Sequence, residues 1–122
     1  MRILVTGSRE FTDLEMIRTA LRRSGAELLS GPPTVVHGAN PRGADRIAEA
    51  VAKVDLGWET DPHPANWEQF GKSAGHIRNQ EMVDLAPDVC LGFFKKGAAN
   101  KGTMDCVTRA LRAGIPIRTY WA

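Results

Sequence analysis

Val89–Phe94 (VCLGFF) is the strongest predicted strand of the chain, because its residues are apolar on both faces. A strand of this kind is typical of the centre of a parallel sheet that helices cover on both sides. Short apolar strands are also expected at 3–5 and 35–36, and a weaker one, followed by two prolines, at 58–61. A last strand is expected at 115–121.

Residues at helical spacing separate these strands. The four predicted helices cover 13–25, 44–57, 72–85 and 104–114. Asp13 supplies an N-cap for the first of them, and Pro87 follows the end of the third. Strands and helices in strict alternation pair in parallel through right-handed crossovers. We therefore predict one Rossmann-like, doubly wound α/β domain over residues 1–122, with about five parallel strands and four helices.

The composition is typical of a small cytoplasmic protein without a membrane partner. A length of 122 residues suits one domain, and a hydrophobic fraction of 43% suffices for its core. No stretch approaches the roughly 20 apolar residues that span a bilayer, and the N-terminus lacks the apolar block of a signal peptide. Cys90 and Cys106 lie in apolar patterns, so we expect buried thiols in a reducing compartment.

Glycines and basic residues gather in the loops that follow three of the predicted strands. These loops cover 7–10, 37–45 and 95–103. The C-terminal ends of parallel strands meet at one edge of a sheet, and ligands bind there, near the point where strand order reverses. Helix N-termini at this edge present free N–H groups and a positive dipole end, which suit phosphate. One such glycine would indicate only a turn, but three basic loops together favour phosphate binding.

Two better-known nucleotide motifs are absent from these loops. The segment 97–103 has the two glycines of a Walker A loop, but its lysine precedes the second glycine instead of following it. The segment 38–43 does not have the G-x-G-x-x-G pattern of dinucleotide-binding enzymes. The three histidines are scattered and form no ligand pair with a cysteine, so no metal site and no required cofactor are predicted.

Five blocks of sequence, in this order and spacing, resemble the YspA-type branch of the SLOG superfamily. The blocks are GSR with Phe11 and Asp13 at 7–13, HG with GAD at 37–45, PANW at 64–67, GKSAG at 71–75, and RN with Met82 at 78–82. The resemblance covers nearly the whole chain. It implies a Rossmann-like sheet with a site for a nucleotide or nucleotide derivative. Members of the superfamily are inferred to sense or process such ligands in bacterial and phage conflict systems.

The loops and the resemblance together give the candidate ligand-binding residues. These are Gly7, Ser8, Arg9, His37, Gly38, Arg42, Gly43, Asp45, Lys72, Arg78, Asn79, Gly102 and Thr103. We expect the ligand to be a small nucleotide or derivative, held by a sensor, a carrier or a sequestering protein. Trp67 and Phe70 precede the third helix near the same edge, where they would either stack on a base or cover the core.

The LOG phosphoribohydrolases of the same superfamily supply an alternative function, nucleotide N-glycosidase. Their pattern P-G-G-x-G-T-x-x-E is matched here by Gly102 and Thr103, but its glutamate falls on Cys106. Asp105 stands one position early, which on a helix is a turn of about 100°. If the protein were such an enzyme, the resemblance would make Arg78, Glu81 and Asp105 its catalytic residues.

The DprA proteins of the superfamily supply a second alternative, nucleic-acid binding. Basic residues here alternate with acidic ones, as Arg46 does with Glu49, which argues against a DNA-binding surface. The resemblance to LOG-type proteins also implies a homodimer that uses the third or fourth helix.

Overall fold

Five parallel strands form one sheet in the computed structural model, which describes residues 1–27 and 31–122. The strands are β1 (Arg2–Gly7), β2 (Thr34–His37), β3 (Glu59–Pro62), β4 (Val89–Phe94) and β5 (Ile117–Trp121). Their order across the sheet is β3-β2-β1-β4-β5, so the order reverses between β1 and β4. This arrangement confirms the predicted Rossmann-like α/β fold and places the reversal at the two central strands.

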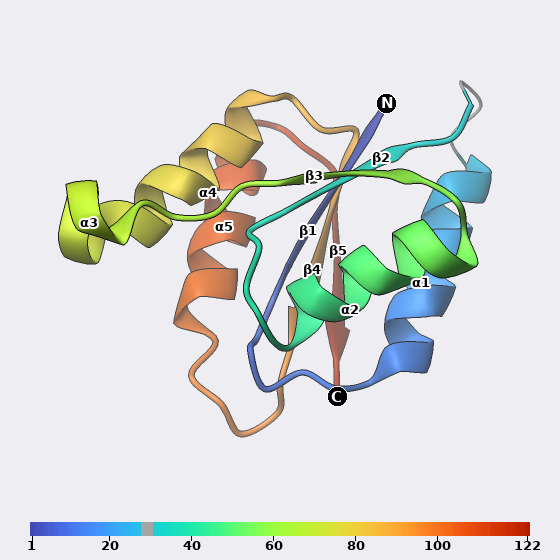
Figure 1. Ribbon diagram of the computed structural model, residues 1–122, viewed down its shortest axis with the longest axis horizontal. Helices are drawn as coiled ribbons and strands as arrows, with labels where there is room; N and C mark the ends of the chain where they lie inside the picture. The colour runs from blue at the N-terminus through green and yellow to red at the C-terminus, as the bar shows by residue number, and fades with distance from the viewer. Residues whose placement is uncertain (28–30) are drawn as a thin grey trace.

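Helices cover both faces of the sheet (Figure 1). One face carries α1 (Leu14–Glu27) and α2 (Ala44–Ala50), which continues as the π-helical turn η1 (Val51–Asp55). The other face carries α4 (Ala74–Asp84) and α5 (Lys101–Arg112). The short helix α3 (Trp67–Phe70) and the 3₁₀ turn η2 (Gly71–Ser73) lead into α4, and α3 projects away from the sheet in Figure 1. No helix in the described ranges is both long and apolar enough to cross a membrane.

Alternate residues of the central strands pack against the two helical layers. Ile3 and Val5 of β1 belong to the cluster beneath α1 and α2, whereas Leu4 belongs to the cluster beneath α4 and α5. Both faces are therefore dry, which explains why the strands read as continuous apolar runs. Cys90 and Cys106 are buried free thiols of the second cluster, as expected. Their mutual hydrogen bond and burial raise the pKa of the Cys90 thiol, so it stays protonated.

Helix α1 runs two residues beyond the predicted end at Gly25. Gly25 does not stop the helix. Its missing side chain instead makes room for Trp58. A Cβ at Gly25 would lie only 2.5 Å from the indole ring of Trp58. The glycine therefore serves helix packing, a role that its place in the sequence does not distinguish from a helix end.

The segment before the third predicted helix also differs from expectation. The helix expected at 72–85 is α4, which begins at Ala74, and the preceding helix α3 was not predicted. Asn66 caps α3, since its Oδ1 accepts a hydrogen bond of 3.0 Å from the backbone N–H of Gln69. The predicted last strand likewise begins later, at Ile117, while Ile115 is buried in the second core cluster.

Replacement of Gly7 by alanine is expected to destabilise the fold by about 2 kcal/mol, because the core at that point has no space for a methyl group. A Cβ at Gly7 would lie 2.4 Å from the Cβ of Ala44 and 3.0 Å from that of Phe93. Gly75→Ala is the control, since its Cβ would meet only the Trp67 ring, at 3.5 Å. Urea denaturation measures both variants, and equal stabilities would contradict the prediction.

Candidate functional site

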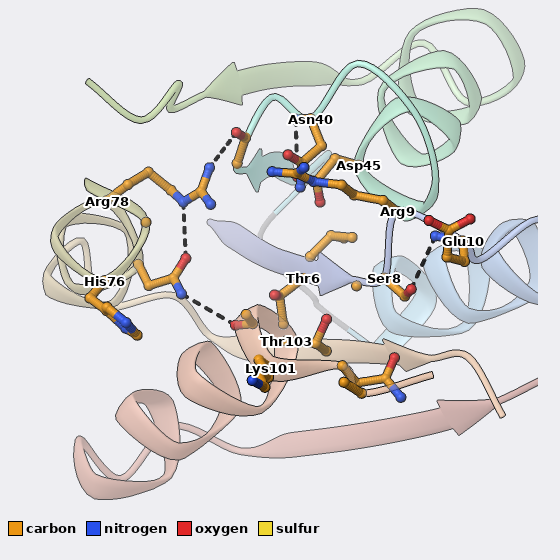
Figure 2. A pocket seen from close by; sticks show the side chains of 18 of the residues that line it. Thr6, Ser8, Arg9, Glu10, Asn40, Asp45, His76, Arg78, Lys101 and Thr103 are labelled. Carbon is orange, nitrogen blue, oxygen red and sulfur yellow. Dashed lines mark hydrogen bonds between the residues drawn. The ribbon is translucent and has the colours of Figure 1, made fainter. Parts of the chain in front are cut away.

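A cavity of about 440 Å³ opens where the central strands β1 and β4 end. Its walls come from the loop after β1, the loop after β2, the helix α4, and the loop before α5 with the first turn of that helix (Figure 2). It therefore lies at the reversal of strand order, where open parallel sheets bind ligands. Its volume falls in the range of small-molecule sites.

Ten of the thirteen residues that the sequence predicts for ligand binding line this cavity. They are Gly7, Ser8, Arg9, Gly38, Asp45, Lys72, Arg78, Asn79, Gly102 and Thr103. The fold thus brings together residues that are up to 96 positions apart in the chain, from Gly7 to Thr103. His37, Arg42 and Gly43 do not line it.

His37 is buried beside the cavity and has a structural role. Its Nε2 lies 2.7 Å from Oε1 of Glu49, and its Nδ1 accepts a hydrogen bond of 3.0 Å from the backbone N–H of Ala39. Although burial acts in the opposite direction, hydrogen bonds from His37, Lys53 and Thr60 lower the pKa of Glu49. Both ring nitrogens of His37 are thus occupied within the protein, which leaves neither for a ligand.

Gly43 and Arg42 connect two loops instead of forming the cavity wall. Gly43 has a φ of 78°, and a Cβ there would lie 2.4 Å from the carbonyl oxygen of Ser8. Arg42 is exposed and pairs with Glu10 at 3.1 Å, which joins the same two loops. Arg42 also lines a neighbouring cavity of about 400 Å³.

Arg78 reaches from α4 across the cavity mouth towards the loop after β2 (Figure 2). Its Nη1 donates to the carbonyl oxygen of Gly38 at 2.5 Å, and its Nε donates to Oδ1 of Asn79 at 2.9 Å. Neither acceptor is a carboxylate. Gly38 makes this reach possible, since a Cβ there would lie 2.5 Å from Nη1. The guanidinium is thus held in place by uncharged hydrogen-bond acceptors, although its charge also acts on the buried Asp45.

Asn79 is buried and joins α4 to the start of α5. Its Nδ2 donates to the carbonyl oxygen of Gly102 at 3.3 Å and to Oδ2 of Asp105 at 3.0 Å. Asp105 also pairs with Arg109 and His76. Although burial acts in the opposite direction, hydrogen bonds from Arg109, Asn79 and His76 lower the pKa of Asp105. Asp105 is thus an ionised partner in the α4–α5 contact and does not line the cavity.

Glu81 lies on the exposed surface of α4 and does not line the cavity either. The two carboxylates that the LOG comparison names as catalytic candidates are therefore both outside it. Arg78 alone of that group is in the cavity wall.

The first turn of α5 faces the cavity with free backbone N–H groups. Asn100, which precedes the helix, has a left-handed φ of 53° and does not cap it with its side chain. Its amide instead holds the preceding loop, donating to the carbonyl oxygens of Lys95 and Ala98. The N–H groups of Gly102 and Thr103 belong to the turn that no intrahelical acceptor satisfies. The positive end of the helix dipole thus points at the cavity.

Three cations line the cavity without carboxylate partners among the described residues. Arg9, Lys72 and Lys101 line the cavity, and none of them forms a salt bridge with a residue in 1–27 or 31–122. Lys101, one of the basic residues of the predicted phosphate-binding loops, lines the cavity. His76 and Asn40 also line it, although the sequence does not predict them as site residues.

Asp45 is a buried carboxyl group in the cavity wall, only 3% exposed. Its Oδ2 accepts a hydrogen bond of 3.3 Å from the backbone N–H of Asn40. Burial raises the pKa of Asp45, and this hydrogen bond and the charges of His37 and Arg78 offset the effect only in part. A perturbed carboxyl group in a cavity is a frequent mark of a functional site.

The protein is thus Rossmann-like, with a cavity at the reversal of strand order. The chain belongs to the YspA, cpYpsA-related SLOG family (YAcAr), whose family model matches residues 1–70. It is 42% identical over 126 residues to the Gene 61 protein of Mycobacterium phage D29. The alignment covers 98% of this chain and 95% of the phage protein. No solved structure matches it significantly. The resemblance found in the sequence is thus confirmed.

Asp45→Asn is expected to stabilise the protein at pH 7 by on the order of 1 kcal/mol, because the amide keeps the hydrogen-bond acceptor without a buried charge. The raised pKa makes the unfolded state lose its proton first, so the folded state loses stability as the pH rises above about 3.8. Below that pH the variant should have no advantage.

Urea denaturation at pH 3.5 and pH 7 measures this effect, with Glu68→Gln on exposed α3 as the control. A variant less stable than the unmodified protein at pH 7 would show that the ionised carboxylate stabilises the fold.

Proposed function

We propose that the protein binds a phosphate-bearing nucleotide or nucleotide derivative in the cavity, as a sensor, carrier or sequestering protein. The observation that carries the proposal is the N-terminus of α5, which has no side-chain cap and lines a cavity with three cations that form no salt bridge in 1–27 or 31–122. Phosphate groups bind to such helix ends through backbone N–H groups and the dipole. Membership of the SLOG family supports a nucleotide-related ligand.

The charges of the cavity support an anion as ligand. Arg9, Lys72, Arg78 and Lys101 line it, against the two carboxyl groups of Glu10 and Asp45. Glu10 already pairs with Arg42, and the four cations outnumber the two carboxyl groups whether or not Asp45 is ionised. The wall thus has a net positive charge, which attracts a phosphate and weakens with added salt.

The cavity supports binding better than base release. N-glycosidic cleavage passes through a sugar cation, which a nearby carboxylate stabilises or supplies with water. Asp105 is instead bound to Asn79 and Arg109, and Glu81 is on the outer surface of α4. Neither lines the cavity, so the carboxylates of the LOG pattern do not reach a ligand there, and we propose that the nucleotide is bound without LOG-type hydrolysis.

A nucleotide panel in a thermal-shift assay tests the proposal, with AMP, ADP-ribose and NAD as first candidates. A ligand at 100 times its dissociation constant adds about 2.7 kcal/mol to the free energy of unfolding. Gly102→Val should remain folded, since no atom lies within 4 Å of a Cβ there, but its side chain would block the approach of a phosphate to the helix end. It should therefore lose the ligand-induced shift.

Arg112→Val, on an exposed position of the same helix outside the cavity, is the control and should keep the shift. If no nucleotide raises the melting temperature, or if Gly102→Val binds normally, the proposed site is wrong.

We also propose that the protein is a cytoplasmic homodimer that associates through α5. Met104 and Leu111 are 50% and 66% exposed and seven residues apart, so they lie on one face of the helix. Burial of such a face between two copies would remove apolar surface from water. The two buried free thiols suit a reducing cytoplasm.

Light scattering at tens of micromolar should give twice the chain mass of 13.3 kDa. Leu111→Lys should shift the protein towards the monomer, whereas Arg112→Lys, the neighbouring exposed control, should not. A monomer mass for the unmodified protein would refute the dimer.

A further inference from the structure

The neighbouring cavity of about 400 Å³ continues the first one. The two share five wall residues, namely Arg9, Gly38, Asn40, Trp67 and Arg78. Beyond this shared wall the second cavity is formed by the loop after β2 and by Pro64 and Ala65. The cavities therefore meet along one boundary, and a ligand longer than one nucleotide would occupy both.

Trp67 lies at this boundary and contributes to neither core cluster. Its surface is 53% exposed, and none of the four residues of α3 is buried. The cap at Asn66 nevertheless holds α3 in place. Trp67 therefore does not cover the core, which was one of its two expected roles. Phe70 lines neither cavity, so it is not placed to stack on a base there. An exposed indole between two cavities offers a face on which a base can stack.

Basic side chains line both cavities and the wall that the cavities share. Arg9 and Arg78 belong to the shared wall, Lys72 and Lys101 to the first cavity only, and Arg42 to the second only. Arg78 is fixed by the carbonyl oxygen of Gly38 and by Asn79, so its position at the boundary is set before a ligand arrives. An anionic group in the middle of a ligand would therefore meet two guanidinium groups.

We propose that the site takes a ligand with two nucleoside halves joined by phosphate. The linking phosphates would lie between Arg9 and Arg78, and each cavity, of similar volume to the other, would hold one nucleoside half. Trp67 would stack on a base at the boundary. This inference rests on the proposed function, because it assumes a nucleotide ligand in the first cavity, and it specifies the class of that ligand.

Titration calorimetry with AMP and with P1,P2-di(adenosine-5′) diphosphate, repeated with the guanine counterparts, tests the proposal. For at least one base the two-part ligand should bind about tenfold or more tightly than the mononucleotide, which corresponds to about 1.4 kcal/mol. Two variants address the second cavity. Ala65→Trp should fill it, and Arg42→Ala should remove its cation.

Both variants should lower the ratio of the two affinities towards one, and Arg46→Ala, on the exposed side of α2, should leave the ratio unchanged. If Ala65→Trp does not fold, Arg42→Ala alone decides, because its exposed pair with Glu10 contributes little to stability. Mononucleotides that bind as tightly as the two-part ligands, with a ratio that no variant changes, would overturn this inference and leave the proposed function intact. If neither the mononucleotides nor the two-part ligands bind, both this inference and the proposed function are wrong.

Discussion

The backbone N–H of Ala44 donates to the carbonyl oxygen of Ser8 at 3.2 Å, and this contact fixes the start of α2 against the end of β1. It requires two glycines. Gly7 lets the Ala44 methyl group approach the strand, and Gly43 lets the chain pass the Ser8 carbonyl with a positive φ. Because α2 begins there, Asp45 enters the cavity wall and the loop after β2 lies beside Arg9. The positions of Asp45 and of the loop after β2 thus both depend on the close approach of the Ala44 backbone to that of Ser8.

The opposite wall depends on a second, polar contact. Asn79 accepts a hydrogen bond from Arg78 and donates to Gly102 and Asp105, so one buried amide sets the arginine relative to the end of α5. Such a fixed arrangement lowers the loss of side-chain freedom when a ligand binds. Asp105 takes part in this wall through Asn79, Arg109 and His76, outside the cavity itself.

The fold follows from the sequence because apolar runs and helical spacing report burial directly. VCLGFF at 89–94 reads as a central strand since both of its faces meet helices. The grouping of the loops can also be predicted from the sequence, because the C-terminal ends of parallel strands lie at the same edge of the sheet. The role of a residue cannot be predicted in this way when it depends on a contact with a residue far away in the sequence. Gly25 looks like a helix end until Trp58 is placed beside it, and His37 looks like a ligand-binding residue until Glu49 takes its ring nitrogen.

The buried carboxyl group and the cations around it restrict how a ligand can lie. The buried carboxyl group of Asp45 accepts hydrogen bonds in either protonation state, whereas the end of α5, with Lys101, attracts phosphate. The two groups are on opposite walls, one at the start of α2 and the other at the start of α5. Within the proposed function, a ligand therefore gains most when its phosphate faces α5 and its hydroxyl or amino groups face Asp45. The site therefore favours an anion that carries hydrogen-bond donors at a distance from its phosphate, as a nucleotide does.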